Sequence, residues 1–197
     1  TENQEQRAKL IDILNHDVQR IERLITDYSQ MLKDEVALSK EKMKKIDLKL
    51  IAKSVVDDFN SIYEAKRGIK IILQDPNDQD ECIINGIENR VEQIIANLLD
   101  NSISFSDNNK KILVEISKNE RSKIILKVID EGKGFKETNT QKIFNRFYSN
   151  RPDNFGEHSG LGLNIVKNLV DLHGATICAS NNFMQKGANV EIEFPKA

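Results

Sequence analysis

The 197-residue chain has few of the residues that mark special structural classes: no tryptophan, three prolines, nine glycines and two cysteines. The scarcity of proline and glycine excludes collagen-like and low-complexity chains. Charged residues make up 30% of the sequence and hydrophobic residues 39%, which is the balance of a globular protein. The length predicts one or two domains with a real core.

Neither sign of charge dominates, because 29 basic and 31 acidic residues leave a formal net charge of −2. This balance gives no reason to expect nucleic acid as a partner. No apolar run approaches the roughly 18 residues that span a membrane, and no signal peptide opens the chain. Because the first residue is Thr1 rather than Met, we expect the cytoplasmic portion of a longer protein, with any membrane anchor upstream.

The two cysteines, Cys82 and Cys178, are far apart in the sequence and belong to no CxxC motif. Nearby paired histidines are also lacking. This pattern favours reduced, buried thiols of a cytoplasmic protein over a disulfide or a metal site.

The N-terminal segment has apolar residues at steps of three and four, which predicts an amphipathic helix with a coiled-coil-like seam. The seam comprises Leu10, Leu14, Val18, Ile21, Ile25, Tyr28 and Leu32. A long helix with one apolar stripe needs partners, so we expect one arm of a helical bundle completed by another chain or by sequence outside this one. Residues 34–45 are polar and are expected to be linker or frayed helix, which separates segment 1–45 from a domain at 46–197.

Residues 46–197 alternate between helical and strand periodicity. Helices are predicted at 46–67, 87–105 and 161–172. Strands are predicted at 69–73, 82–85, 112–117, 123–130, 175–180 and 188–194, and residues 136–159 are expected to be a loop with a short helix around Phe144. Helices on one face of a mixed sheet would make an α+β fold of the α/β-sandwich type.

Four short motifs follow one another in the second half of the chain. They are Asn97-Leu98-Leu99-Asp100-Asn101, Asp130-Glu131-Gly132-Lys133-Gly134-Phe135, Phe144-Asn145-Arg146-Phe147 and Gly160-Leu161-Gly162-Leu163. In this order they resemble the N, G1, F and G2 boxes of the ATP-binding domain of two-component sensor histidine kinases. The resemblance covers roughly residues 46–195 and implies the Bergerat-type fold of the gyrase, Hsp90, histidine kinase and MutL superfamily.

The N box places Asn97 and Asn101 four residues apart, on one face of a helix. Two such asparagines alone are ordinary surface residues. The resemblance implies that Asn101 gives an amide oxygen to Mg²⁺, which takes few protein oxygens and completes its octahedron with phosphates and water. Gyrase-, Hsp90- and MutL-type ATPases carry a glutamate at position 97 as general base, so Asn97 favours a kinase over an ATPase.

The end of the N box departs from the family pattern. Ser104 and Phe105 stand where histidine kinases often have Lys and Tyr. Phe105 can still stack on adenine, but a cation facing the phosphates is lost. Three basic residues are candidates to replace it: Lys133, Arg146 and Arg151.

The G1 box follows an apolar strand, and by itself an Asp-x-Gly-x-Gly sequence can be only a strand that ends in a tight turn. The resemblance implies that the Asp130 carboxylate accepts a hydrogen bond from the adenine amino group. Gly132 and Gly134 would let the backbone approach the nucleotide.

The F box is core packing by default, and its place between the glycine boxes implies that Phe144 and Phe147 form the hinge of a lid. In the G2 box, Gly160, Leu161, Gly162 and Leu163 open a helix whose free N–H groups can receive phosphate oxygens. The family usually has a further glycine two residues before Gly160, where this chain has His158.

The phospho-acceptor histidine is expected to lie before Thr1. His16 begins a sequence similar to the family's acceptor box, but Ile21 replaces the proline of that box and belongs to the apolar stripe. The family also places a helical hairpin between acceptor and ATP-binding domain, and only one long helix separates His16 from Ile46. His16 is therefore a minor candidate, and His173 is interpreted as a structural residue at a helix end.

The resemblance implies the catalytic part of a sensor histidine kinase that uses ATP and Mg²⁺, forms a homodimer through its N-terminal helix and acts on a response regulator. Two alternatives stay open. One is a superfamily ATPase that drives conformational change, which steady hydrolysis would support. The other is a non-catalytic nucleotide-binding dimerisation module, which binding without transfer would support.

Overall fold

The computed structural model describes residues 41–75, 81–136, 139–146, 148, 160–182 and 186–197, together with single positions between 7 and 29. Those single positions have helical backbone, which agrees with the predicted period. Their apolar side chains are 53–61% exposed, namely Leu10, Ile11, Leu14, Val18, Ile21 and Ile25. Tyr28, Leu32 and the intervening positions of the predicted helix lie outside the described residues.

The main sheet has five strands in the order β2-β4-β5-β7-β6. Their bounds are β2 Lys70–Gln74, β4 Lys111–Lys118, β5 Ile124–Asp130, β6 Thr176–Asn181 and β7 Ala188–Phe194. Strands β2 and β4 pair in parallel and the other neighbours pair antiparallel, so the sheet is mixed, as predicted. Along β5 and β7 every second residue is buried, which means that the sheet has one core face.

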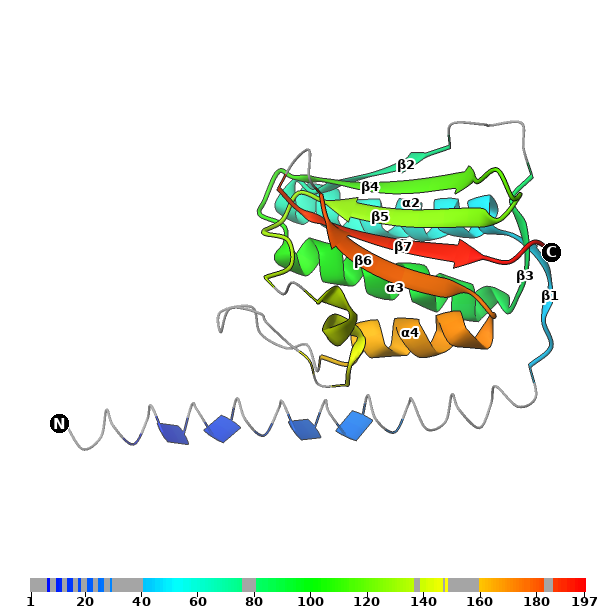
Figure 1. Ribbon diagram of the computed structural model, residues 1–197. Helices are drawn as coiled ribbons and strands as arrows, with labels where there is room; N and C mark the ends of the chain where they lie inside the picture. The colour runs from blue at the N-terminus through cyan, green and yellow to red at the C-terminus, as the bar shows by residue number, and fades with distance from the viewer. Residues whose placement is uncertain are drawn as a thin grey trace.

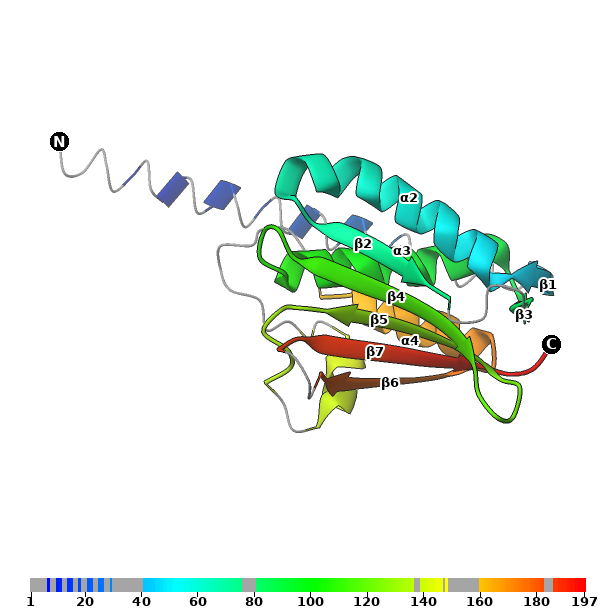
Figure 2. The same ribbon diagram turned by 90° about the horizontal axis from the view of Figure 1, so that it is seen from above.

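Three helices cover that core face, as Figures 1 and 2 show. They are α2 (Leu48–Arg67), α3 (Glu88–Phe105) and α4 (Gly162–Leu172). The carboxylate of Asp47 caps α2 by accepting a hydrogen bond from Lys49 N at 2.9 Å, and Gly68 ends the helix with φ 64°. A 3₁₀ helix, η1 (Thr140–Phe144), precedes α4. The predicted α/β sandwich is confirmed.

A second, two-stranded sheet corrects the expectations for residues 44–47: residues 44 and 45 are not linker, and residues 46 and 47 do not begin the helix. Lys44–Asp47 form strand β1, which pairs antiparallel with β3 (Ile83–Gly86), with Ile46 opposite Ile84. The four residues are mostly polar and too short to show a period of two, so the sequence did not reveal the strand. Pairing with the buried β3 fixes it, and the connection continues into α2 through a 3.0 Å bond from Leu48 N to Cys82 O.

The environments of the cysteines match the sequence expectation only in part. Cys82 is buried just before β3, where burial raises the pKa of its thiol. Cys178 is exposed, so its predicted burial was wrong. It lies on β6 opposite Glu191, on the face of the sheet that the helices do not cover.

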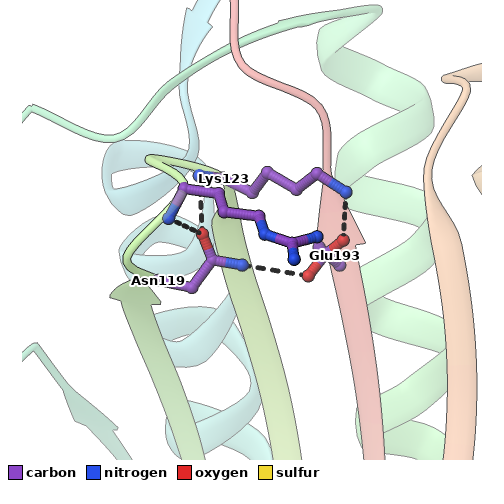
Figure 3. Close-up of polar contacts among 4 residues, drawn as sticks. Asn119, Lys123 and Glu193 are labelled. Atoms are coloured by element: carbon purple, nitrogen blue, oxygen red, sulfur yellow. Dashed lines mark hydrogen bonds and ion pairs between the residues drawn. The ribbon is translucent and has the colours of Figure 1, made fainter.

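Polar side chains fasten the β4–β5 turn to β7 at one end of the sheet (Figure 3). The Asn119 side chain accepts from the backbone N–H groups of Arg121 and Lys123, both at 3.0 Å, and donates to Glu193 at 3.0 Å. Lys123 Nζ also lies 2.5 Å from Glu193. These bonds tie a local turn to a strand from the far end of the chain. Within the described part of the chain, no helix combines the length and the apolar character needed to cross a membrane.

Candidate functional site

The site forms where the end of β5 meets α3 and the start of α4. Asp130, the last residue of β5, is only 4% exposed. Its Oδ1 atom accepts hydrogen bonds from Gly132 N at 2.8 Å and from Ala188 N at 3.0 Å. The Ser102 hydroxyl of α3 also bonds to this carboxylate. These bonds orient the carboxylate, as its assignment to adenine recognition requires.

Burial raises the pKa of Asp130, because removal from water disfavours the charged carboxylate. The hydrogen bonds from Ala188 N, Gly132 N and Ser102 act in the opposite direction and lower the pKa. Desolvation is the larger effect. The protein thus keeps a polar acceptor at this position against a clear electrostatic penalty, which is typical of a binding site rather than of a turn.

Two glycines pack tightly around the carboxylate. A Cβ added at Gly132 would lie 2.7 Å from the carbonyl oxygen of Phe105, so a side chain there would push the G1 turn away from α3. A Cβ at Gly187, just before β7, would overlap the carbonyl oxygen of Asp130. Gly134 has φ +72° and approaches the side chain of Asn181. The backbone therefore comes close to Asp130 from two loops.

The N box and the G2 box lie side by side. The side-chain nitrogen of Asn97 donates to Gln93 O at 2.9 Å, which orients the amide. The Asn97 oxygen lies 3.5 Å from the point where a Cβ of Gly162 would be, at the first residue of α4. Asn101, one turn further along α3, is half-buried. The structure thus brings the two asparagines, the Asp130 end of β5 and the start of α4 into one region.

The remaining residues of the G2 and F boxes pack around this region. Gly160 has φ +71°, Leu161 is buried and Leu163 packs against the core. Phe144 is buried at the end of η1, and its carbonyl accepts a 2.9 Å hydrogen bond from the Asn164 side chain of α4. The F box is therefore fixed to the G2 helix by a residue that belongs to neither motif.

The structure does not place every predicted residue at the site. His16, Phe147, Arg151 and His158 lie outside the described residues. Lys133 and Arg146 are exposed, and which cation replaces the lysine expected at Ser104 stays an open prediction. Phe105 is half-buried at the end of α3, next to Gly132, as its proposed contact with the base requires.

The sequence analysis did not identify three residues that contact elements of the site. They are Ser102, Asn164 and Arg67, the last of which binds the end of α3. Ser102 falls just after the N box, on the turn of α3 that faces β5, so its helical spacing was a signal. Asn164 and Arg67 contact residues 20 to 41 positions away in the sequence, and no local pattern marks such contacts.

His173 is structural, as interpreted from the sequence. It is 3% exposed, its Nδ1 lies 2.6 Å from Leu169 O, and its Nε2 accepts a hydrogen bond from Ile87 N at 3.1 Å. Burial lowers the pKa of the imidazole, so the neutral ring is favoured.

The fold and this site together define an ATP-binding domain of the α/β-sandwich class. The chain belongs to the family of histidine kinase-, DNA gyrase B- and HSP90-like ATPases, which matches residues 86–197. This confirms the family that the four boxes indicated. Among its relatives are sensor histidine kinases. Sensor protein ChvG of Rhizobium meliloti (strain 1021) is 34% identical over 185 residues, which is 91% of this chain and 32% of that protein. The histidine-protein kinase BaeS of Escherichia coli (strain K12) is 30% identical over 186 residues, which is 92% of this chain and 38% of that protein.

Solved structures of histidine kinases share the fold. The catalytic domain of histidine kinase ThkA superposes with a TM-score of 0.68 at 24% identity, covering 79% of this chain and 97% of that one. Full-length ShkA in complex with AMPPNP gives 0.71 at 21% identity, covering 97% of this chain and 39% of that one. ThkA in complex with the response regulator TrrA gives 0.69 at 23%, covering 96% of this chain and 51% of that one. The chain spans about a third of the length of the curated relatives described above.

Proposed function

We propose that this chain binds Mg²⁺–ATP between α3, the G1 turn and the start of α4, and transfers the γ-phosphoryl group to a histidine. The acceptor histidine would lie on a helix upstream of Thr1, and the phosphoryl group would then pass to an aspartate of a response regulator. Residues 1–45 would form the second helix of the dimerisation hairpin, and residues 46–197 the catalytic domain.

The observation that carries this proposal is the buried, oriented carboxylate of Asp130. Two backbone N–H groups fix Oδ1, so the group is held ready to accept a hydrogen bond from the adenine amino group. Gly132 lets the G1 turn pack against the backbone of Phe105, and the Phe105 ring can stack on the base. A buried acceptor beside a glycine turn, with an aromatic residue at the end of the adjoining helix, suits a purine better than a sugar or a peptide.

The phosphate side of the site rests on the start of α4. The first N–H groups of an α-helix have no partner within the helix, and the positive end of the helix dipole favours phosphate oxygens. Gly162 at the first position leaves this end open towards Asn97. We therefore assign Gly160, Leu161, Gly162 and Leu163 to binding of the phosphate groups.

The identity of residue 97 supports transfer over hydrolysis. An amide is a poor general base, and the nitrogen of Asn97 is already engaged with Gln93 O. Water would therefore be weakly activated beside the γ-phosphate. Asn101 would hold Mg²⁺, whose charge neutralises the phosphates during transfer. The amide oxygen is a hard neutral ligand of the kind that Mg²⁺ accepts.

The complexes of two structural relatives support the proposed partners. ShkA was solved with AMPPNP and ThkA with a response regulator, and we infer ATP and a response regulator for this chain by that likeness. The exposed apolar positions from Leu10 to Ile25 support a homodimer through the N-terminal helix. We also propose that this portion resides in the cytoplasm, below any upstream membrane anchor.

The decisive experiment supplies the chain with γ-labelled Mg²⁺–ATP and a separate helical hairpin, which joins the sequence upstream of Thr1 in the full-length protein to residues 1–45. We expect acid-labile, base-stable phosphate on the hairpin, and no label on the chain itself. Transfer would be slow, because the two parts lose the high effective concentration of a tether. Asn101→Ala should abolish labelling.

Two other results would select the alternative functions. Steady release of inorganic phosphate without a labelled hairpin would mean a conformational ATPase. Binding of ATP with neither label nor hydrolysis would mean a nucleotide-sensing module. Label on the chain that disappears in His16→Ala would make His16 the acceptor and would overturn our placement of the N-terminal helix.

A further inference from the structure

Arg67 joins the end of α2 to the end of α3. Its guanidinium group donates to Ile103 O at 2.9 Å, to Ser106 O at 2.7 Å and to the side chain of Asn108 at 3.0 Å. The backbone carbonyl of Arg67 also accepts from Asn109 N at 2.9 Å. One residue thus makes four hydrogen bonds to the last turn of α3 and to the loop that follows it.

The C-terminal end of α3 needs such a partner. The last four carbonyl groups of a helix have no partner within the helix, and the helix dipole makes this end negative. The last turn of α3, a helix described throughout, contains no basic residue, and Ser104 stands where related kinases often carry a lysine. Arg67 brings a positive charge and a planar set of donors to this end from another helix.

The turn that Arg67 holds is also the turn that contacts the adenine side of the site. Ser102 bonds to the Asp130 carboxylate. The Phe105 carbonyl lies against Gly132, close enough that a Cβ there would approach it to 2.7 Å. Arg67 binds the carbonyls of Ile103 and Ser106, which directly follow Ser102 and Phe105 in the sequence. A shift of this turn would therefore move the Asp130 carboxylate and the G1 turn together.

We propose that Arg67 is a positioning residue for nucleobase recognition: through the last turn of α3 it sets the Ser102–Asp130–Gly132 arrangement that accepts adenine. The inference rests on the proposed binding of ATP. It concerns the base more than the phosphates, because Asn97 lies about two turns away, near the middle of α3, with Gly162 of α4 beside it. Loss of Arg67 should therefore weaken discrimination between bases more than it weakens phosphate binding.

The test compares Arg67→Ala, Arg67→Lys and the control Lys66→Ala in the 197-residue chain. Lys66 is the neighbouring basic residue in the last turn of α2 and is exposed. Calorimetry gives Kd for ATP and for GTP with Mg²⁺ at a temperature where thermal unfolding shows each variant to be folded. We expect the preference for ATP over GTP to fall about tenfold in Arg67→Ala. Arg67→Lys should lie between, because an ammonium keeps the charge without the fork of donors. Lys66→Ala should match the parent.

A second readout needs no nucleotide. The amide resonance of Gly132, whose N–H bonds to Asp130, should shift in both Arg67 variants and stay in place in Lys66→Ala. If Arg67→Ala does not fold, Arg67→Lys carries the test by itself. A lower melting temperature with an unchanged ATP/GTP ratio and an unchanged Gly132 resonance would make Arg67 a purely structural residue and overturn the inference. A parent chain that binds neither nucleotide would instead refute the proposed function.

Discussion

At the scale of single residues, Asp130 shows a conflict between stability and binding. Its burial raises the pKa of the carboxyl group, so the folded protein holds the charged form at a penalty. The hydrogen bonds from Gly132 and Ala188 offset only part of this penalty. A buried carboxylate that destabilises its own protein is retained where a ligand needs it.

The first prediction concerns the Asp130→Asn variant. The amide presents a donor as well as an acceptor, so we expect ATP and ADP to bind at least tenfold more weakly, a loss of roughly 1.4 kcal/mol or more. Isothermal calorimetry on both proteins measures this directly. Glu131→Gln is the matched control, because Glu131 is the neighbouring carboxylate and only half-buried. Unchanged affinity in Asp130→Asn would make the carboxylate structural only.

The second prediction is the pH dependence of stability at the same position. A carboxyl group with a raised folded pKa contributes stability that is complete below its unfolded pKa of about 3.9. That contribution is lost as the pH rises through the folded pKa. Relative to the parent, Asp130→Asn should therefore gain melting temperature between pH 4 and pH 7, although it binds ATP less well. A difference in melting temperature that shrank or stayed constant over this range would contradict the raised pKa.

Whether a residue of the site could be predicted from the sequence depends on whether its contacts are local. The boxes around Asn101, Asp130 and Gly162 could be predicted, because each is a run of consecutive residues that resembles a motif of histidine kinases. Arg67 and Asn164 could not be predicted, because their partners come from other elements. The exposure of Cys178 could not be predicted either, because it depends on which face of β6 packs against the helices.

At the scale of elements, backbone groups at both ends of α3 form hydrogen bonds with side chains of neighbouring helices. Ile87 precedes it and has no polar side chain for a cap, and Ile87 N donates instead to His173 at the end of α4. At the other end, Arg67 of α2 donates to Ile103 O and Ser106 O. The helix that carries Asn97 and Asn101 is thus fixed by α4 and α2, which explains why its position is well defined without strong caps of its own.

The third prediction is that His173→Ala destabilises the domain by about 1–3 kcal/mol at pH 8, because Ile87 N would be left buried without an acceptor. The folded pKa of His173 is lowered, so its contribution is complete above the unfolded pKa of about 6.5 and is lost as the pH falls through the folded pKa. Urea unfolding at pH 8 and pH 5 should show a smaller difference at the lower pH. Asn168→Ala, an exposed change on α4, is the control. An equal difference at both pH values would mean that the ring acts only by packing.

The helices and strands themselves were mostly visible in the sequence. β4, β5 and β7 alternate buried and less buried residues, and α2 ends at the glycine that was expected to end it. β1 was missed because its strand character comes from pairing with β3, which begins more than thirty residues later. Local periodicity identifies an element that is amphipathic by itself, but not one that depends on its partner.

At the scale of the whole molecule, the catalytic domain and the N-terminal segment differ in how their apolar residues are used. In the domain, apolar residues of the three α-helices, of η1 and of the strands β2 to β7 form one buried cluster. In the N-terminal segment, the described apolar positions are more than half exposed. An apolar stripe of this length in water favours association with another helix, which is the basis of the proposed dimer.

The last prediction tests that stripe. We expect the chain to self-associate weakly in sedimentation experiments, because a four-helix bundle needs four helices and each copy brings one. Changing Leu14 and Ile21 together to lysine should abolish association, since the two residues lie seven apart on one face and the charges would be placed in the seam. Thr26→Lys is the control for an added lysine outside the seam, because residue 26 lies about 120–140° around the helix from either position. ATP affinity should be the same in all three proteins, because all the residues that we assign to nucleotide binding lie between residues 97 and 163. A parent chain that stays monomeric at high concentration would mean that the stripe packs against its own domain. In that case, a lower ATP affinity in the double variant would show that this packing supports the site.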